Sequence, residues 1–441
     1  MKTINKIFMA IMLMAGSMSY SNGQTPIKED ESLYKVRIEN KWGYIDKTGK
    51  YVVNPRFDNI GNFSEGLAWV KFRGKYGFID KTGECVVNSQ FDDAYSFSEG
   101  LTWVEIGGKY SLIDMTGKYV VNTKFDYALD FSEGLAMVKV GSKCGYINKT
   151  GKYVVNPKYD NANSFYEGLA MVKVGGKWGL IDKTGKYIMN PNCDGIRSSS
   201  DNLIWVKVEG KWGLIDKTGN FVINPQFDDV DLFFEGLARV KVGDKWGLID
   251  KSGKYVVNPQ FEDADSFSEG VAKVKVGGKW GLIDTTGILI VNPQFNSVFE
   301  FDESEGVAMV KVGGKWGYIG KAGKYVVNPQ FDDTRGFSEG LARVKVKDKW
   351  GYIDKTGKYI IDLQFEDARG FSEGLARVKV GDKWGYIDKT GKIVVNPLFD
   401  DVDNFSGGLA RIKIGGKYGF IDKTGEYVVY PQFDDIMLKW R

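Results

Sequence analysis

Carboxylates are the residue type that could do chemistry in this chain, because its 441 residues include 57 Asp and Glu and no histidine. Histidine is the commonest general base and zinc ligand, so its absence disfavours nucleophilic triads and zinc centres. Acidic pairs recur and could supply oxygen ligands for Ca²⁺. They are Asp92-Asp93, Asp228-Asp229, Glu262-Asp263, Asp332-Asp333, Glu366-Asp367, Asp400-Asp401 and Asp434-Asp435. Their spacing matches no calcium-binding loop, so we expect solvated loops, with calcium binding as the alternative.

A second acidic motif, Asp284-Thr285-Thr286-Gly287, superficially matches the Asp-Thr-Gly of aspartic proteases. Equivalent Asp-Lys-Thr-Gly segments occur at 46–49, 216–219 and 354–357. An Asp that opens a turn and bonds its own backbone explains all of them. We therefore predict turns here, and no catalytic residue, metal site or cofactor in the chain.

The three cysteines, Cys85, Cys144 and Cys193, stand in different repeats at positions that are aromatic in most other copies. An odd count at unrelated positions indicates neither a disulfide framework nor a metal site. We interpret them as small apolar replacements.

All these residues belong to a tandem repeat, and a fixed period of this size is the signature of a repeat architecture. The copy at 245–259 reads Lys-Trp-Gly-Leu-Ile-Asp-Lys-Ser-Gly-Lys-Tyr-Val-Val-Asn-Pro. With Trp246 as the marker position there are twelve copies, and ten of the eleven steps are 34 residues while one is 36. The marker position holds Trp42, Tyr76, Tyr110, Cys144, Trp178, Trp212, Trp246, Trp280, Trp316, Trp350, Trp384 and Tyr418.

Each repeat is predicted to contain three β-strands. Residues 237–242 alternate in polarity, and Gly243-Asp244 is a two-residue link typical of a hairpin into a second strand at 246–250. A turn with Gly leads to a third strand at 255–257, which we expect to end at Asn258-Pro259 because proline lacks an N–H. The Phe residues of the connecting segment are expected to plug the core between repeats.

The hairpin register predicts which side chains share a face. A true two-residue turn places Lys241 opposite Trp246 and Val240 opposite Gly247. One face then carries Ala238, Val240, Val242, Gly247 and Ile249, and the other carries Arg239, Lys241, Trp246, Leu248 and Asp250. Lys241 over the Trp246 ring could add about 0.5–1 kcal/mol of cation–π attraction.

One position, called the variable position here, changes from copy to copy while its neighbours hardly change. It holds Lys35, Trp69, Trp103, Met137, Met171, Trp205, Arg239, Lys273, Met309, Arg343, Arg377 and Arg411. If repeats stack in parallel, it draws one stripe, and exposed Trp and Met would be unusual on plain surface. We predict a ligand-binding stripe formed by Trp69, Trp103, Trp205, Arg239, Arg343, Arg377 and Arg411. The alternative is that these Trp side chains pack between repeats.

A three-stranded sheet is marginal alone and must stack on its neighbours. Twelve units exceed the usual range of about four to eight propeller blades. We therefore predict an all-β fold, a tandem array of about twelve three-stranded antiparallel meander units forming an open curved or superhelical solenoid. Two propeller-like rings are the alternative.

The amino terminus is predicted to be a secretory signal peptide, since Lys2 and Lys6 precede an apolar run at 7–15 and small and polar residues at 16–23. The run is too short to span a bilayer. Cleavage could follow Ser19, Ser21 or Gly23, and Gly23 is favoured. The predicted segments are a signal peptide at 1–23, a leader at 24–31, twelve repeats at 32–436 and a tail at 437–441. We expect an exported protein that is periplasmic, secreted or attached to the cell surface.

The repeats resemble the WG repeat family of bacterial proteins, named for a Trp-Gly pair. The pair is present at Trp42, Trp178, Trp212, Trp246, Trp280, Trp316, Trp350 and Trp384, each followed by Gly. The match extends to the Lys-Thr-Gly-Lys and Phe-Ser-Glu-Gly-Leu-Ala segments and covers about nine-tenths of the chain. The resemblance implies an all-β repeat scaffold, often exported, with no general activity and no catalytic residues.

The expected function is that of a non-catalytic exported scaffold with an extended surface that binds a protein, peptide or glycan. Interleaved charges, 60 basic against 57 acidic, disfavour nucleic acid and anionic membranes as partners. One alternative is a carbohydrate-active protein that uses paired carboxylates. Another is a choline- or glucan-binding hairpin solenoid, although the repeats here are longer.

Overall fold

The fold is all β in the computed structural model, which describes residues 33–198, 202–302 and 305–437. These residues form 48 strands and no helix. No described segment is therefore a helix that could cross a membrane. The predicted signal peptide and leader lie outside the described residues, as do residues 438–441 of the predicted tail. The chain is divided into two compact units, with the boundary between Gln226 and Phe227.

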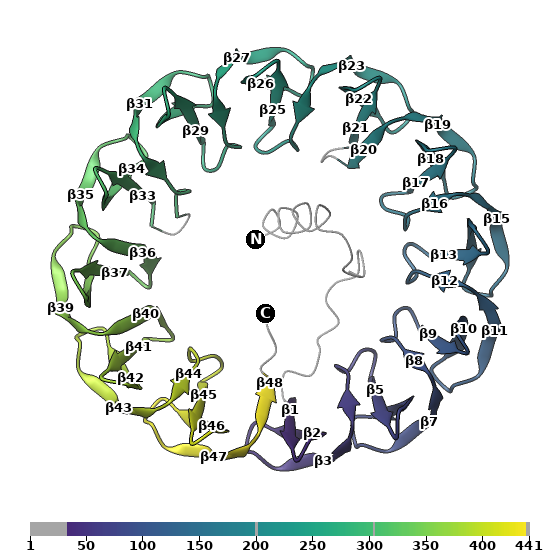
Figure 1. Ribbon diagram of the computed structural model, residues 1–441, viewed down its shortest axis with the longest axis horizontal. Helices are drawn as coiled ribbons and strands as arrows, with labels where there is room; N and C mark the ends of the chain where they lie inside the picture. Colours follow the sequence, from purple (N-terminus) through teal and green to yellow (C-terminus); the bar gives the residue numbers. More distant parts are fainter. Residues whose placement is uncertain (1–32, 199–201, 303–304, 438–441) are drawn as a thin grey trace. The chain divides into compact units, whose positions relative to one another are not determined.

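The first unit extends from β1 into β23 (Figure 1). Its strands are β1 (Leu33–Ile38), β2 (Lys41–Asp46), β3 (Tyr51–Phe57), β4 (Asn59–Ile60), β5 (Leu67–Phe72), β6 (Lys75–Asp80), β7 (Cys85–Phe91), β8 (Asp93–Ala94), β9 (Leu101–Ile106), β10 (Lys109–Asp114), β11 (Tyr119–Phe125), β12 (Tyr127–Ala128), β13 (Leu135–Val140), β14 (Lys143–Asn148), β15 (Tyr153–Tyr159), β16 (Asn161–Ala162), β17 (Leu169–Val174), β18 (Lys177–Asp182), β19 (Tyr187–Cys193), β20 (Gly195–Ser198), β21 (Leu203–Val208), β22 (Lys211–Asp216) and β23 (Phe221–Phe227).

The second unit continues with the same succession of strands. They are β24 (Asp229–Val230), β25 (Leu237–Val242), β26 (Lys245–Asp250), β27 (Tyr255–Phe261), β28 (Asp263–Ala264), β29 (Val271–Val276), β30 (Lys279–Asp284), β31 (Leu289–Phe295), β32 (Ser297–Val298), β33 (Val307–Val312), β34 (Lys315–Gly320), β35 (Tyr325–Phe331), β36 (Asp333–Ser338), β37 (Leu341–Val346), β38 (Lys349–Ile353), β39 (Tyr359–Phe365), β40 (Asp367–Ser372), β41 (Leu375–Val380), β42 (Lys383–Asp388), β43 (Ile393–Phe399), β44 (Asp401–Val402), β45 (Leu409–Ile414), β46 (Lys417–Asp422), β47 (Tyr427–Phe433) and β48 (Asp435–Met437).

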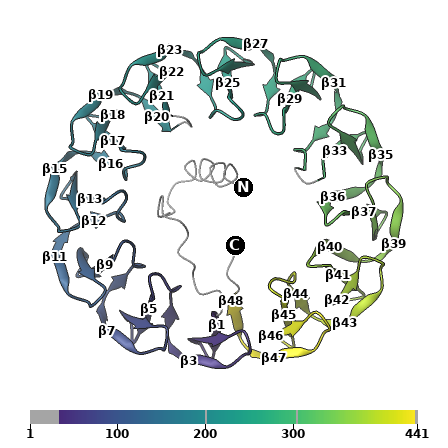
Figure 2. The same ribbon diagram turned by 180° about the vertical axis from the view of Figure 1, so that it is seen from behind.

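Each sheet has four antiparallel strands, and the prediction of three-stranded units is wrong. The additional strand is short, two residues in most sheets, and lies in the segment that was expected to be a loop. In the sheet β28-β29-β30-β31, Asp263 pairs with Lys275 and Ala264 with Val274. A long strand thus passes directly into the next sheet, as β15 does into β16 in Figures 1 and 2.

The sheet order also overturns the predicted open solenoid. The described residues form twelve four-stranded antiparallel sheets in tandem. Four-stranded sheets of this kind are the blades of β-propellers. The alternative of propeller-like rings therefore named the right kind of sheet.

The hairpin register agrees with the prediction. Lys241 pairs with Trp246 and Val240 with Gly247, and the Lys241 ammonium lies 5.7 Å from the centroid of the Trp246 ring. The third strand differs, because β27 continues past Pro259 to Phe261 with a shift in register between Trp246 and Leu248. Proline is tolerated there because β27 is an edge strand and the register shift leaves that part of the ladder irregular.

The core lies between successive sheets instead of within one repeat. One cluster joins Leu248, Val257 and Phe261 of one sheet to Ala272, Val274 and Ile283 of the next. The predicted Phe plugs are confirmed in this cluster, since Phe261 is 5% exposed and Phe267 is 4% exposed. In this cluster the facing residues of two successive sheets are buried against one another.

Candidate functional site

The cations at the variable position lie in joints between sheets. Arg411 donates from Nη1 to the carbonyl of Ile436 at 2.7 Å, and Arg343 and Arg377 donate to the carbonyls of Ala368 and Val402. In each case the acceptor is 25 residues further along the chain, in β40, β44 or β48. Lys35 and Lys273 make longer versions of this contact, at 3.4 and 3.3 Å. These Lys and Arg side chains therefore connect successive sheets, a role that the sequence pattern did not predict.

The tryptophans of the predicted stripe differ in exposure. Trp103 is 2% exposed, donates from Nε1 to the Leu129 carbonyl at 3.0 Å and stacks on Phe131 with 6.2 Å between centroids. Trp205 is fully buried, whereas Trp69 is half-buried and lies 5.6 Å from the Tyr76 ring. Ligand binding by this stripe stays a prediction, and Trp103 and Trp205 do not offer the exposed rings that it requires.

Arg239, the remaining residue of the predicted stripe, is engaged by acidic side chains. It forms an ion pair with Asp231 and lies 3.8 and 3.7 Å from Asp263 and Asp265. Its guanidinium also lies 4.9 Å from the centroid of the Trp246 ring. The seven predicted residues stand in seven different sheets, so the structure does not gather them into one pocket.

The recurring carboxylates stabilise turns and connections. Asp284 Oδ1 accepts hydrogen bonds from the Thr286 N–H and hydroxyl at 2.9 and 2.6 Å, which confirms the predicted turn. These bonds, with that of the Thr286 hydroxyl the largest, hold the pKa of Asp284 below its usual range. In the acidic pairs, Asp92 forms an ion pair with Lys75 of the preceding sheet and accepts from the Gly107 N–H at 2.7 Å. Among the described residues, no group of three or more Cys, Asp and Glu side chains is arranged to hold a metal ion.

The glutamates of the recurring Glu-Gly pairs form a second set of connections between sheets, which the sequence pattern did not predict. Glu235 accepts hydrogen bonds from the N–H groups of Glu269 and Gly270, at 2.7 and 2.9 Å, in the next sheet. Glu269 in turn forms an ion pair with Lys321 of the sheet that follows. Glu269 and Gly270 both adopt positive φ, as in a tight turn. The recurring Glu-Gly pair was the signal in the sequence that could have predicted this turn.

One sheet, β12 to β15, departs from the repeat at three positions along a single cross-strand row. The row consists of Tyr127, Lys139, Cys144 and Tyr159, which are paired successively across the four strands. At the position of Tyr127 the other repeats carry Asn59, Asp93, Asn161, Gly195, Asp229, Asp263, Ser297, Asp333, Asp367, Asp401 and Asp435. Cys144 replaces the aromatic marker, and Tyr159 replaces a residue that is Phe in every other repeat except at Cys193.

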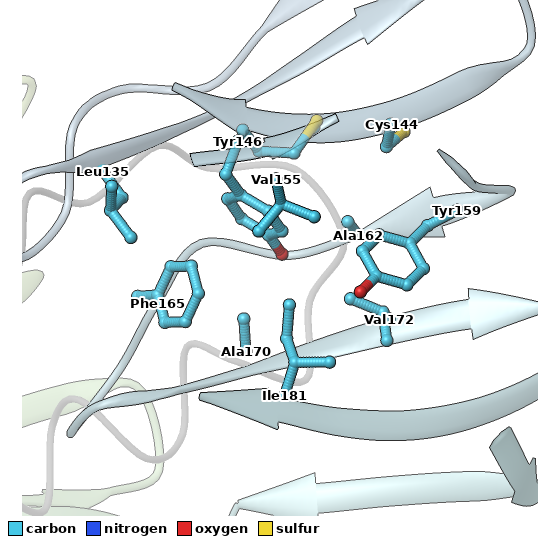
Figure 3. Packing of buried hydrophobic residues seen from close by; sticks show 11 residues of the cluster. Leu135, Cys144, Tyr146, Val155, Tyr159, Ala162, Phe165, Ala170, Val172 and Ile181 are labelled. Carbon is cyan, nitrogen blue, oxygen red and sulfur yellow. The ribbon is translucent and has the colours of Figure 1, made fainter. Parts of the chain in front are cut away.

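A hollow of about 520 Å³ opens at this row. The β12–β15 hollow, as it is called below, is lined by Asp126, Tyr127, Met137, Lys139, Gly141, Cys144, Asp160 and Asn161. Figure 3 shows Cys144 beside Tyr159, with Ala162 of the following sheet nearby. In eight other sheets a lysine ammonium lies 4.9–5.9 Å from the centroid of the marker ring. Lys139 occupies the same place, but the small Cys144 side chain provides no ring for it.

The charged groups around the hollow differ in their ion pairs and hydrogen bonds. Asp126 forms an ion pair with Lys109 and accepts from the Gly141 N–H at 2.7 Å, and Asp160 is held likewise by Lys143 and the Gly175 N–H. The Lys139 ammonium has no hydrogen bond or ion pair within the described residues. Burial raises the pKa of the Cys144 thiol, although Lys139 acts in the opposite direction. A protonated thiol at neutral pH is a poor nucleophile, so the hollow is suited to binding.

The predicted repeat is found by comparison with protein families. The family described as WG containing repeat matches twelve consecutive segments, at 42–76, 76–110, 110–144, 145–178, 178–212, 212–246, 246–280, 280–316, 316–350, 350–384, 384–418 and 418–437. These matches confirm the repeat count and the resemblance. No curated protein matches the chain.

Solved structures share only a distant likeness with this chain. A eukaryotic initiation factor is 11% identical with a TM-score of 0.34, covering 82% of this chain and 95% of its own. The extracellular domain of a putative one-component system from B. thetaiotaomicron is 10% identical with a TM-score of 0.24, covering 93% and 72%. PorZ from Porphyromonas gingivalis, a surface component of the type-IX secretion system, is 10% identical with a TM-score of 0.23, covering 88% and 65%.

Proposed function

Because the chain belongs to the WG containing repeat family, we propose that it is a non-catalytic binding scaffold whose ligand-binding site is the β12–β15 hollow. The observation that carries this proposal is the coincidence of Tyr127, Cys144 and Tyr159 in one row. Random substitution would scatter such changes from the repeat pattern over many sheets, whereas a binding site requires the changed residues to lie together. The ligand is a protein, a peptide or a glycan.

The absence of catalysis is supported by the way the candidate groups are used. The chain has no histidine, and its acidic pairs and turn aspartates recur in most repeats with the same structural contacts. Catalysis needs a proton acceptor or nucleophile in a singular environment. Cys144 is singular, but burial keeps its thiol protonated. Measuring hydrolysis of glycan and peptide substrates tests this part of the proposal, and turnover that depends on Cys144 would contradict it.

Export of the protein is part of the proposal and is supported by the amino-terminal sequence. Lys2 and Lys6, the apolar run and the small residues that follow have the order of a signal peptide. Expression of the full chain in a bacterium, followed by fractionation and mass determination, is expected to give an exported form lacking about the first 23 residues.

The proposed site is tested by comparative capture of partners. We expect a partner that is retained by the wild-type chain and lost by Cys144→Trp, because the indole would fill the hollow. The matched control is Tyr76→Trp, which introduces the same residue at the marker position of a sheet that already has a ring there. Equal capture by the wild type and by folded Cys144→Trp would overturn the proposal. The same three proteins applied to a glycan array distinguish a glycan from a protein ligand.

A further inference from the structure

We infer that the β12–β15 hollow accepts an indole ring from outside the chain, which takes the place of the marker side chain that this sheet lacks. The inference rests on the proposed function, because it names the ligand chemistry of the same hollow. Its first basis is complementarity with the protein's own repeat. In the next sheet, Trp178 occupies the equivalent position with the Lys173 ammonium 5.4 Å from its centroid. The same lysine is present at Lys139 without a ring.

The size of the hollow fits a bound molecule of this class. Small-molecule pockets have volumes of about 300–1,000 Å³, and the open hollow has a volume of about 520 Å³. An indole with a short substituent is well below this volume. Cys144 is only 2% exposed and lies at the floor of the hollow, whereas Tyr127 is 43% exposed and forms an accessible wall.

Tyr127 provides the second basis, because it places an aromatic wall where most repeats have a small or acidic residue. Its side chain is 43% exposed, and its ring lies edge-on to Tyr110 of the preceding sheet, with 5.7 Å between centroids. This contact holds the Tyr127 ring beside the opening. Aromatic rings pack favourably at separations of about 4.5–7 Å. Met137 also lines the hollow and adds an apolar side chain to it.

The charges favour an indole over an aromatic acid. Asp126 and Asp160 both line the hollow, so a ligand carboxylate would meet two negative groups. The face of a neutral ring is attracted to the Lys139 ammonium, and an indole N–H can donate to a carboxylate oxygen. A benzene ring would lack that donor. The ring is that of a tryptophan side chain in a protein or peptide, which are among the ligands of the proposed function. A free indole presents the same ring without the peptide groups.

The experiment is fluorine NMR on the full chain, with 5-fluoroindole and N-acetyl-5-fluorotryptophanamide as probes. The expected result is saturable broadening or shift of at least one probe with the wild type and with Tyr76→Trp. Cys144→Trp is expected to weaken binding at least tenfold, and Cys144→Ala, which keeps the hollow open, to retain it. Lys139→Met should weaken binding by about two- to fivefold, the loss expected for an exposed cation–π contact. Tyr127→Asp, which restores the residue type of most repeats, should also weaken binding.

Binding of the blocked tryptophan supports a peptide source of the ring. Binding of the free indole alone supports recognition of the ring but contradicts a peptide source. Saturable binding of neither probe, or equal affinity for the wild type and folded Cys144→Trp, would overturn the inference. The capture experiment separates this failure from failure of the proposed function. If neither probe binds but Cys144→Trp still loses the captured partner, the hollow is a binding site for a different chemical group. If the partner is retained as well, both proposals fail.

Discussion

The guanidinium of Arg411 reaches from its own sheet to the carbonyl oxygen of Ile436, 2.7 Å away and 25 residues further along the chain. Its Nε also donates to Asp403 Oδ2 at 2.7 Å. Arg343 and Arg377 make the corresponding carbonyl contact, and the Trp103 indole makes it with Leu129. In these copies the variable position is therefore a joint between sheets, because Arg and Trp are long side chains with an N–H donor at the far end.

Loss of one such joint is expected to destabilise the protein. Arg377→Met keeps much of the apolar stem but removes the donor to the carbonyl of Val402, a residue only 2% exposed. An unsatisfied buried acceptor costs about 1–3 kcal/mol, and chemical denaturation should show this loss in the free energy of unfolding. The control is Arg335→Met, whose side chain is 55% exposed and is expected to change stability by no more than about 0.5 kcal/mol. Equal effects of the two substitutions would contradict the assigned joint.

Trp103→Ala distinguishes a joint residue from a ligand anchor. Trp103 is 2% exposed and packs against Phe125 and Phe131. Truncation of a buried tryptophan costs about 3–5 kcal/mol, so the thermal unfolding midpoint should fall markedly. Trp69→Ala should have a smaller effect, because Trp69 is half-buried. An unchanged midpoint for Trp103→Ala would instead favour the predicted ligand-binding stripe.

Gly247, which follows the marker residue Trp246, is expected to tolerate no side chain. A Cβ at Gly247 would lie 2.6 Å from both the Val257 carbonyl oxygen and the Pro259 nitrogen, and backbone atoms cannot move aside cheaply. Gly247→Ala should therefore cost about 3 kcal/mol, the upper end of the usual overpacking range. Gly243→Ala is the matched control, since Gly243 has φ of +59° and no atom within 4 Å of an added Cβ. It should lose only about 1 kcal/mol from the left-handed conformation. Denaturant midpoints of the two variants test this order.

Stability is expected to fall at acidic pH because of the turn aspartates. Hydrogen bonds from Thr356 and Thr390 hold the pKa values of Asp354 and Asp388 below their usual range. A carboxyl whose pKa is lowered by folding stabilises the native state above the unfolded value, about 3.9. That stability is lost as the pH falls through the lower folded value. The unfolding midpoint should hence be steady near neutral pH and decline below about pH 4.

The pH prediction has a variant that the repeat itself suggests. Asn148 occupies the same turn position and accepts from the Thr150 N–H and hydroxyl at 3.0 and 2.8 Å. Changing Asp354, Asp388 and Asp422 to Asn keeps an acceptor in each turn but removes the titration. The decline in midpoint between pH 4 and pH 2 should become shallower, about in proportion to the groups removed. An unchanged decline would show that other carboxyls dominate acid unfolding.

The period and the turn residues were enough to predict the long strands and their pairing. Lys241 opposite Trp246 followed from the two-residue hairpin, because the register of such a hairpin is a local property. The turn at Asp284 was equally local. The third strand was predicted too short, because Pro259 normally ends a strand but sits here on an irregular edge.

The candidate site was only partly visible. Cys144 was recognised as a departure at the marker position, and Asp126-Tyr127 interrupts the recurring acidic pairs. Nothing local showed that Tyr127, Cys144 and Tyr159 form one row, because Tyr127 and Lys139 are paired across a loop through a strand of two residues. A pattern of that length is too short to identify as a strand.

The sequence by itself determined the repeat, the antiparallel hairpins and the absence of histidine chemistry, because these depend on residue types and on contacts within about a dozen positions. Only the tertiary structure decided that each sheet has a fourth strand, that Arg377 donates a hydrogen bond to the following sheet, and that a hollow opens at Cys144. These features depend on the contacts between successive sheets, and no single repeat contains both sides of such a contact.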